Sequence, residues 1–171
     1  MSALPALAIG ALLAAAAPGH PLRDRVDRSF SLIPLGTMRA PARLGLRELR
    51  QNGCHRYAEC DWADARGVRH YFWEADELVV KSIRARDMAG REIAALGIGR
   101  ARTRRDVLAR ARAFLPGVAI RCEHGTAQPE AGDADPPVTS CAASLDAGWI
   151  RIWFDAADQL TEVRLDARHF T

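Results

Sequence analysis

The sequence predicts an α+β fold: a tandem repeat of two units, each with a helical N-terminal half followed by an antiparallel β-sheet. Three observations support this prediction. The stretches 35–41 and 98–104 both begin with an apolar residue and a glycine, and both precede a helical pattern. The stretches 68–83 and 150–165 both contain a strand pattern, a turn with aspartate and a second strand pattern. Each unit also has two cysteines at equivalent places.

The predicted organisation is a signal peptide at residues 1–17, unit 1 at 29–85, a linker at 86–95 and unit 2 at 96–171. Residues 3–17 form an apolar run that is shorter than the about 20 residues that a transmembrane helix needs. The run ends in small residues, as signal peptidase requires, although no lysine or arginine precedes it. We therefore expect a periplasmic or secreted protein whose mature part has no integral membrane segment.

The helix of unit 2 is predicted to begin after Thr103, a candidate N-cap with Asp106 three residues later. Apolar residues follow at helical spacing, and Pro116-Gly117 ends the helix. In unit 1 the corresponding helix is predicted to begin at Pro41, a favoured first helical residue, and to end at Asn52-Gly53. Its weaker apolar stripe consists of Leu44, Leu46 and Leu49.

Four cysteines follow the candidate signal peptide: Cys54, Cys60, Cys122 and Cys141. An even number in an exported chain favours two disulfides, for which the sequence alone permits three pairings. The repeat favours bonds within each unit, Cys54 with Cys60 and Cys122 with Cys141. A structural zinc site is the weaker alternative, because the gap from Cys54 to Cys60 is wider than the usual spacing of paired zinc ligands. We therefore expect no bound metal.

The tandem order of helical half, antiparallel strands and one disulfide per unit resembles the β-lactamase-inhibitory protein fold. The lead-in at Leu35-Gly36 and Ile98-Gly99 also resembles the single-copy outer-membrane assembly lipoproteins of the SmpA/OmlA type. The resemblance covers residues 31–166. No lipidation cysteine follows the apolar run, so an anchored role is not implied. No stretch matches a β-lactamase-blocking loop residue by residue, so inhibition does not follow from the fold.

Alternation along the predicted strands assigns their side chains to two faces. Val68, His70, Phe72, Ile150, Ile152 and Phe154 are predicted to pack on the helices. The opposite face presents the candidate binding residues Arg69, Tyr71, Trp73, Trp149, Arg151 and Trp153. Aromatic and arginine side chains on an open sheet face are the types that dominate protein–protein hot spots. The alternative is that these side chains pack on a loop or on the other unit and contact no partner.

A second candidate surface is the arginine-rich segment around the start of the unit 2 helix. Arg100, Arg102, Arg104 and Arg105 are candidates for contact with an anionic surface. Most of the arginines in this region lie off the apolar stripe, so the alternative is that they are ordinary solvated helix residues. Export argues against nucleic acid as a ligand.

The sequence contains none of the common catalytic signatures, such as a serine nucleophile elbow, a zinc-protease motif, a phosphate loop or a dinucleotide motif. We therefore assign no catalytic residue and no cofactor, and we favour a protein that is not an enzyme. The leading hypothesis is an exported interaction module that presents its aromatic and arginine face to a protein partner of unknown identity. The alternatives are an inhibitor of a hydrolase such as a β-lactamase, and a small periplasmic enzyme of unknown class.

Overall fold

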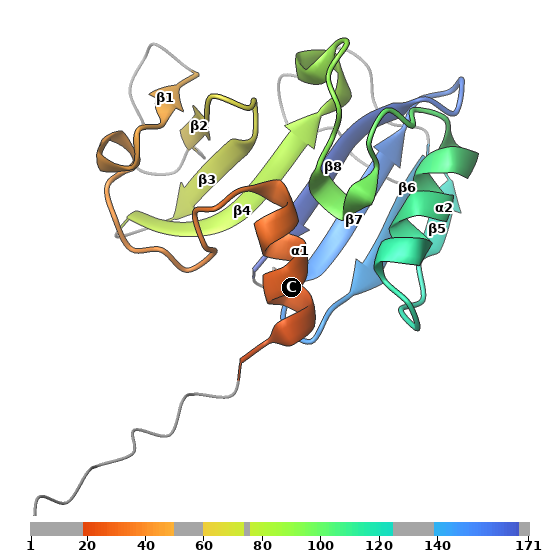
Figure 1. The fold of residues 1–171 in the computed structure, drawn as a ribbon, viewed down its shortest axis with the longest axis horizontal. Helices are drawn as coiled ribbons and strands as arrows, with labels where there is room; N and C mark the ends of the chain where they lie inside the picture. Colours follow the sequence, from red (N-terminus) through yellow and green to blue (C-terminus); the bar gives the residue numbers. More distant parts are fainter. Residues whose placement is uncertain (1–18, 50–59, 74–75, 125–138, 168–171) are drawn as a thin grey trace, which may run out of the picture.

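The computed structural model describes residues 19–49, 60–73, 76–124 and 139–167. These residues form one antiparallel sheet of eight strands in the order β1-β2-β3-β4-β8-β7-β6-β5, with the two α-helices on one face (Figure 1). The strands are β1 (Arg47–Glu48), β2 (Cys60–Ala63), β3 (Arg69–Trp73), β4 (Glu77–Arg84), β5 (Arg121–His124), β6 (Thr139–Ser144), β7 (Trp149–Phe154) and β8 (Leu160–Asp166). The helices are α1 (Pro21–Phe30) and α2 (Arg104–Phe114), with 3₁₀ helices η1 (Pro41–Leu44), η3 (Ala85–Met88) and η4 (Ala95–Gly97).

The fold-class prediction is wrong, because one continuous sheet dominates the described part of the chain instead of two tandem units with helical halves. β4 pairs with β8 at the centre, so strands from both predicted units share this sheet. The helix expected from Pro41 is only the 3₁₀ helix η1, and β1 begins at Arg47. Gly45 ends η1 with φ 71°, a conformation that glycine adopts at little steric cost. Glycine also weakens a helix interior, and the predicted leucine stripe spans this glycine.

The helix α2 and the two predicted hairpins are confirmed. Oγ1 of Thr103 caps α2 by accepting a hydrogen bond from the backbone N–H of Asp106 at 3.3 Å. β3 pairs with β4 and β7 pairs with β8, in both cases antiparallel. Asp76 and Asp158 in the connecting turns both have φ 58°. Aspartate tolerates this left-handed conformation better than most residues, which explains its place in both turns.

The helix α1 was not predicted from the sequence. It begins with Pro21, in the favoured first position of a helix. The carboxylate of Asp146, in the turn between β6 and β7, accepts hydrogen bonds from the backbone N–H groups of Leu22 at 3.0 Å and Arg23 at 2.9 Å. The N-terminus of α1 is therefore capped by a residue far away in the sequence, and the residues around Pro21 contain no capping signal that would have predicted the helix.

The core lies between the sheet and the segments α1, η4 and α2, which lie over one face of the sheet (Figure 1). The side chains that were predicted to pack on the helices are all buried: Val68, His70, Phe72, Ile150, Ile152 and Phe154. Within the described residues, neither α-helix has the length and apolar character needed to cross a membrane. The predicted signal peptide at 1–17 lies outside the described residues.

A polar cluster joins α1 to the sheet inside this core. Lys81 of β4 is fully buried, and its Nζ lies 2.5 Å from Oδ1 of Asp27 on α1. Beside this pair, Oγ of Ser31 lies 3.0 Å from Nε2 of His70, and Nδ1 of His70 lies 3.0 Å from the carbonyl oxygen of Val68. Nδ1 is therefore the donor nitrogen, and Nε2 accepts from the serine hydroxyl. Burial lowers the pKa of His70 to about 4, so the ring is neutral at pH 7.

Candidate functional site

A groove of 840 Å³ lies on the outer face of the sheet, away from the helices, over β5, β6 and β7. Its lining comes from residues 117–119 in the turn after α2, from the outward-facing side chains of the three strands and from Ala143 of β6, which is buried. Cys141, Ile150 and Ile152 alternate with these side chains, point into the core and are fully buried. The sheet therefore separates the groove from the core.

The small side chains of β6 form the floor of the groove. Ser140, Ala142 and Ser144 lie directly opposite Trp153, Arg151 and Trp149 of β7. On the other side, β5 places Arg121 opposite Ala142 and Glu123 opposite Ser140. Serine and alanine are much shorter than tryptophan or arginine, so the space above β6 stays open between two rows of taller side chains.

The β7 wall of the groove combines aromatic surface with a cation. Trp149 and Trp153 are half-buried, and Arg151 between them is exposed. The guanidinium of Arg151 lies over the ring of Trp149, 5.1 Å from the ring centroid. This cation–π contact holds the guanidinium at the wall. The wall therefore offers both apolar contact area and N–H donors to a ligand.

The six candidate binding residues lie in two different places. Three of them share the groove: Trp149, Arg151 and Trp153. Arg69 instead forms an ion pair with Asp87, with 2.8 Å between nitrogen and oxygen. Tyr71 is buried, and its hydroxyl lies 3.3 Å from Oγ of Ser82. Trp73 is 47% exposed at the end of β3, outside the groove.

The β5 and β6 sides of the groove were missed from the sequence, although a signal for them exists. Cys122 and Cys141 face each other across β5 and β6, and Cys141 is buried on the core side. In a strand, the residues on either side of an inward-facing residue point outward. This rule places Arg121 and Glu123 beside the first cysteine, and Ser140 and Ala142 beside the second, on the groove side.

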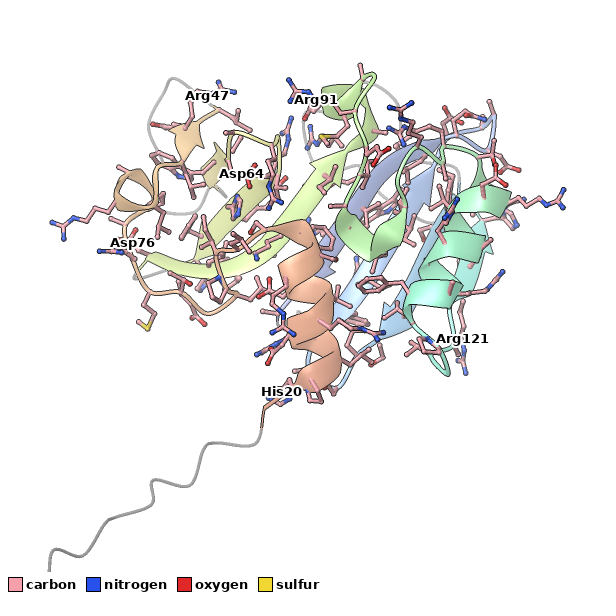
Figure 2. All side chains as sticks on the ribbon, in the orientation of Figure 1. His20, Arg47, Asp64, Asp76, Arg91 and Arg121 are labelled. Carbon is pink, nitrogen blue, oxygen red and sulfur yellow. A yellow bond between two sulfur atoms is a disulfide. The ribbon has the colours of Figure 1, made fainter. Side chains whose placement is uncertain are left out.

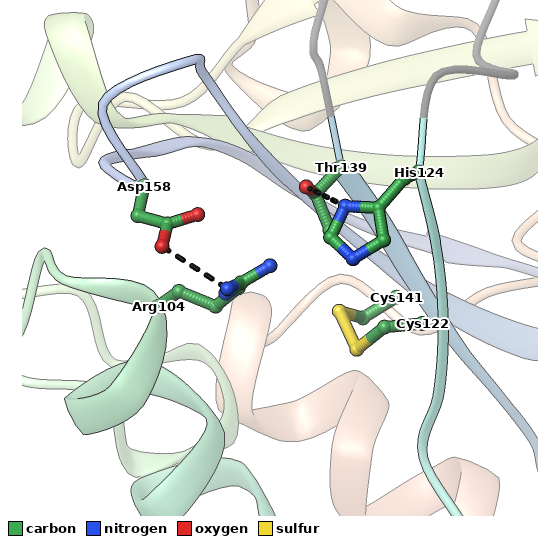
Figure 3. The surroundings of a disulfide bond; sticks show 6 residues. All are labelled: Arg104, Cys122, His124, Thr139, Cys141 and Asp158. Atoms are coloured by element: carbon green, nitrogen blue, oxygen red, sulfur yellow. Dashed lines mark hydrogen bonds and ion pairs between the residues drawn. A yellow bond between two sulfur atoms is a disulfide. The ribbon is translucent and has the colours of Figure 1, made fainter.

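The disulfide between Cys122 and Cys141 confirms one predicted pairing (Figure 3). It joins residues that are direct partners in the β5–β6 register, and it ties β5 to the rest of the sheet. Further along the same strand pair, Nδ1 of His124 lies 3.0 Å from Oγ1 of Thr139. The bond therefore fixes the strand that supplies one wall of the groove, and it is compatible with an oxidising compartment. The other predicted pairing involves Cys54, which lies outside the described residues.

The four arginines predicted to contact an anionic surface lie near the start of α2 and do not line the groove. Arg104 forms an ion pair with Asp158 at 3.1 Å (Figure 3). Arg102 donates hydrogen bonds to three backbone carbonyls. Arg100 lies 3.4 Å from a glutamate carboxylate, and Arg105 is exposed. Contact of this segment with an anionic surface stays a prediction.

Among the described residues, no group of three or more His, Cys, Asp or Glu side chains is placed to hold a metal ion. Comparison with known proteins gives no match: no family model, curated protein or solved structure matches the chain. The resemblance to the β-lactamase-inhibitory protein fold stays a prediction.

Proposed function

We propose that this protein is an exported interaction module whose groove binds a segment of a protein partner. The observation that supports this most strongly is the groove wall, where Trp149 and Trp153 flank Arg151 above a floor of small side chains. Tryptophan and arginine are the residue types most enriched at binding hot spots. Half-buried indole rings offer a large apolar contact area with little side-chain entropy to lose on binding.

The chemistry of the groove favours binding over catalysis. An enzyme site usually gathers several groups that can act as acid, base or nucleophile close together. The titratable side chains in the lining are Arg121, Glu123 and Arg151, and no described histidine or cysteine lines the groove. The lining instead combines aromatic, arginine, serine and alanine side chains with one glutamate, a set suited to recognition.

Export is part of the proposal. The apolar run at residues 3–17 and the small residues that end it support cleavage by signal peptidase. The Cys122–Cys141 disulfide supports an oxidising compartment. Detection of the mature chain in the periplasm or the medium, with its N-terminus near residue 17, would test this part. A chain found only in the cytoplasm with an intact N-terminus would refute it.

Binding is tested by affinity capture with purified protein and extracellular or periplasmic proteins of the producing organism. Trp149→Ala and Trp153→Ala should each weaken capture of the partner by at least about 2 kcal/mol, roughly thirtyfold, because each removes an indole ring from the β7 wall of the groove. Trp73→Ala is the matched control, since this exposed tryptophan lies outside the groove. Capture of the same proteins by both groove variants, with unchanged thermal unfolding, would refute the proposal.

A further inference from the structure

The strand register places four arginines in one row across the outer face of the sheet. The row runs through six neighbouring strands as Arg69, Ser82, Arg164, Arg151, Ala142 and Arg121. Each member lies directly opposite the next, and none of the six is acidic. The groove contains the end of the row at Arg151, Ala142 and Arg121, and Arg121 lies at the edge of the sheet (Figure 2).

Two of the four arginines are neutralised within the protein. Arg69 pairs with Asp87 at 2.8 Å, and Arg164 pairs with Asp166 at 2.9 Å. Within the described part of the chain, no ion pair involves Arg121 or Arg151. The two guanidinium groups that lack an acid are thus the two that line the groove.

The space between these two arginines suits one anionic group. Arg121 and Arg151 stand two strand spacings apart, about 10 Å between their backbones, and only the methyl group of Ala142 lies between them. Two like charges on neighbouring side chains repel each other, and an anion between them replaces the repulsion with two attractions. Arginine also binds a carboxylate through paired N–H donors, which adds directional preference.

The residues of β6 and β7, and in one case of β5, that lie two positions before or after this arginine row form two further rows across the groove, and their chemistry differs. Towards one end of the groove, Ser144 lies opposite Trp149. Towards the other end, Ser140 lies between Trp153 and Glu123. Successive rows on one sheet face are about 7 Å apart, which is also the repeat of same-side residues in an extended peptide. A peptide that runs along β6 therefore presents its alternate side chains to the three rows.

We infer that the groove binds an extended acidic segment of its partner, with one Asp or Glu side chain over Ala142 between Arg121 and Arg151. Apolar side chains two residues before and two residues after this acid pack against Trp149 and Trp153. A second acid beside Trp153 is disfavoured, because Glu123 stands there. This inference rests on the proposed function and adds the chemistry of the partner to it.

The test uses two peptides with blocked ends and a fluorescent label on a short, rigid link, Ser-Leu-Ser-Glu-Ser-Leu-Ser and the same sequence with Gln in place of Glu. Anisotropy titrations with the full chain should show at least about tenfold tighter binding of the Glu peptide. Arg121→Gln and Arg151→Gln should each reduce this preference. Arg105→Gln, which removes an exposed arginine of α2 outside the groove, should leave it unchanged. Added salt should lower the preference, because the site is open to solvent.

The outcomes separate this inference from the proposed function. Equal binding of both peptides, lost in Trp153→Ala, would overturn the acidic specificity and leave the interaction module standing. If neither peptide binds, while capture of partners still depends on the groove tryptophans, the acidic specificity is likewise overturned and the interaction module stands. Arg151-dependent binding of phosphatidylglycerol vesicles without binding of the Glu peptide would overturn the inference in favour of a lipid. If neither peptide binds and capture of partners is unchanged in Trp149→Ala and Trp153→Ala, the proposed function is overturned as well.

Discussion

Lowering the pH should destabilise the protein through His70. The imidazole is fully buried, and burial lowers its pKa from 6.5 to about 4. A nearby carboxylate, Asp64, opposes this shift, whereas Lys81 and Arg66 add to it. Between pH 6.5 and about pH 4, His70 is mostly protonated in the unfolded chain and mostly neutral in the folded chain. Stability therefore rises with pH between about 4 and 6.5, and it falls as the pH is lowered through that window.

The size of the effect follows from the shift. Each pKa unit corresponds to 1.36 kcal/mol, so the shift corresponds to about 3 kcal/mol of stability lost between pH 7 and pH 4. Urea unfolding followed by tryptophan fluorescence, with the disulfide intact, measures the free energy of unfolding at each pH. His70→Gln is the matched variant, because it keeps a polar side chain and cannot take up the proton. The difference between the two pH profiles isolates His70 from the carboxylates that titrate in the same range. Parallel profiles would refute the reasoning.

Three further changes have defined outcomes. Lys81→Met leaves the carboxylate of Asp27 buried without its cation, so it should cost about 3–5 kcal/mol in urea unfolding, and added Asp27→Asn should recover part of this loss. A single-variant cost below about 1 kcal/mol would contradict the buried ion pair. Reduction of the β5–β6 disulfide, which closes a loop with a sequence separation of 19, should lower the free energy of unfolding by about 3 kcal/mol and weaken binding in the groove. Gly148→Ala, at φ 79°, places a Cβ in steric clash with the backbone carbonyl oxygen of Asp166 in β8. Calorimetry should show a much larger loss of Tm than for Gly36→Ala, whose φ is 80° and whose Cβ has no atom of the described residues within contact distance. Equal losses would mean that only the dihedral angle matters.

Features set by neighbouring residues were predictable from the sequence. The N-cap at Thr103 and the hairpin turns at Asp76 and Asp158 depend on contacts within a few residues, and all three are present. The central pairing of β4 with β8 depends on residues about eighty positions apart, and no local pattern encodes it. The predicted helix at Pro41 failed for a local reason, because Gly45 interrupts it.

The same distinction applies to the candidate site. Alternation in one strand was enough to place Trp149, Arg151 and Trp153 on one face. The same alternation placed Arg69 and Tyr71 outward, but their partners come from distant segments: Asp87 pairs with the first, and the guanidinium of Arg164 lies 5.6 Å from the ring centroid of the second. These contacts could not be inferred without the register of the whole sheet.

Within the residues that the structure describes, the sheet ends in a short strand at each edge. β1 has 2 residues and β5 has 4, whereas the central strands β4 and β8 have 8 and 7. An exposed strand edge is a template on which another chain can add a strand, so short edges limit aggregation. The disulfide also ties β5 to β6, which hinders exchange of that strand between two copies of the chain. The bond that fixes one wall of the groove therefore also hinders domain swapping of β5.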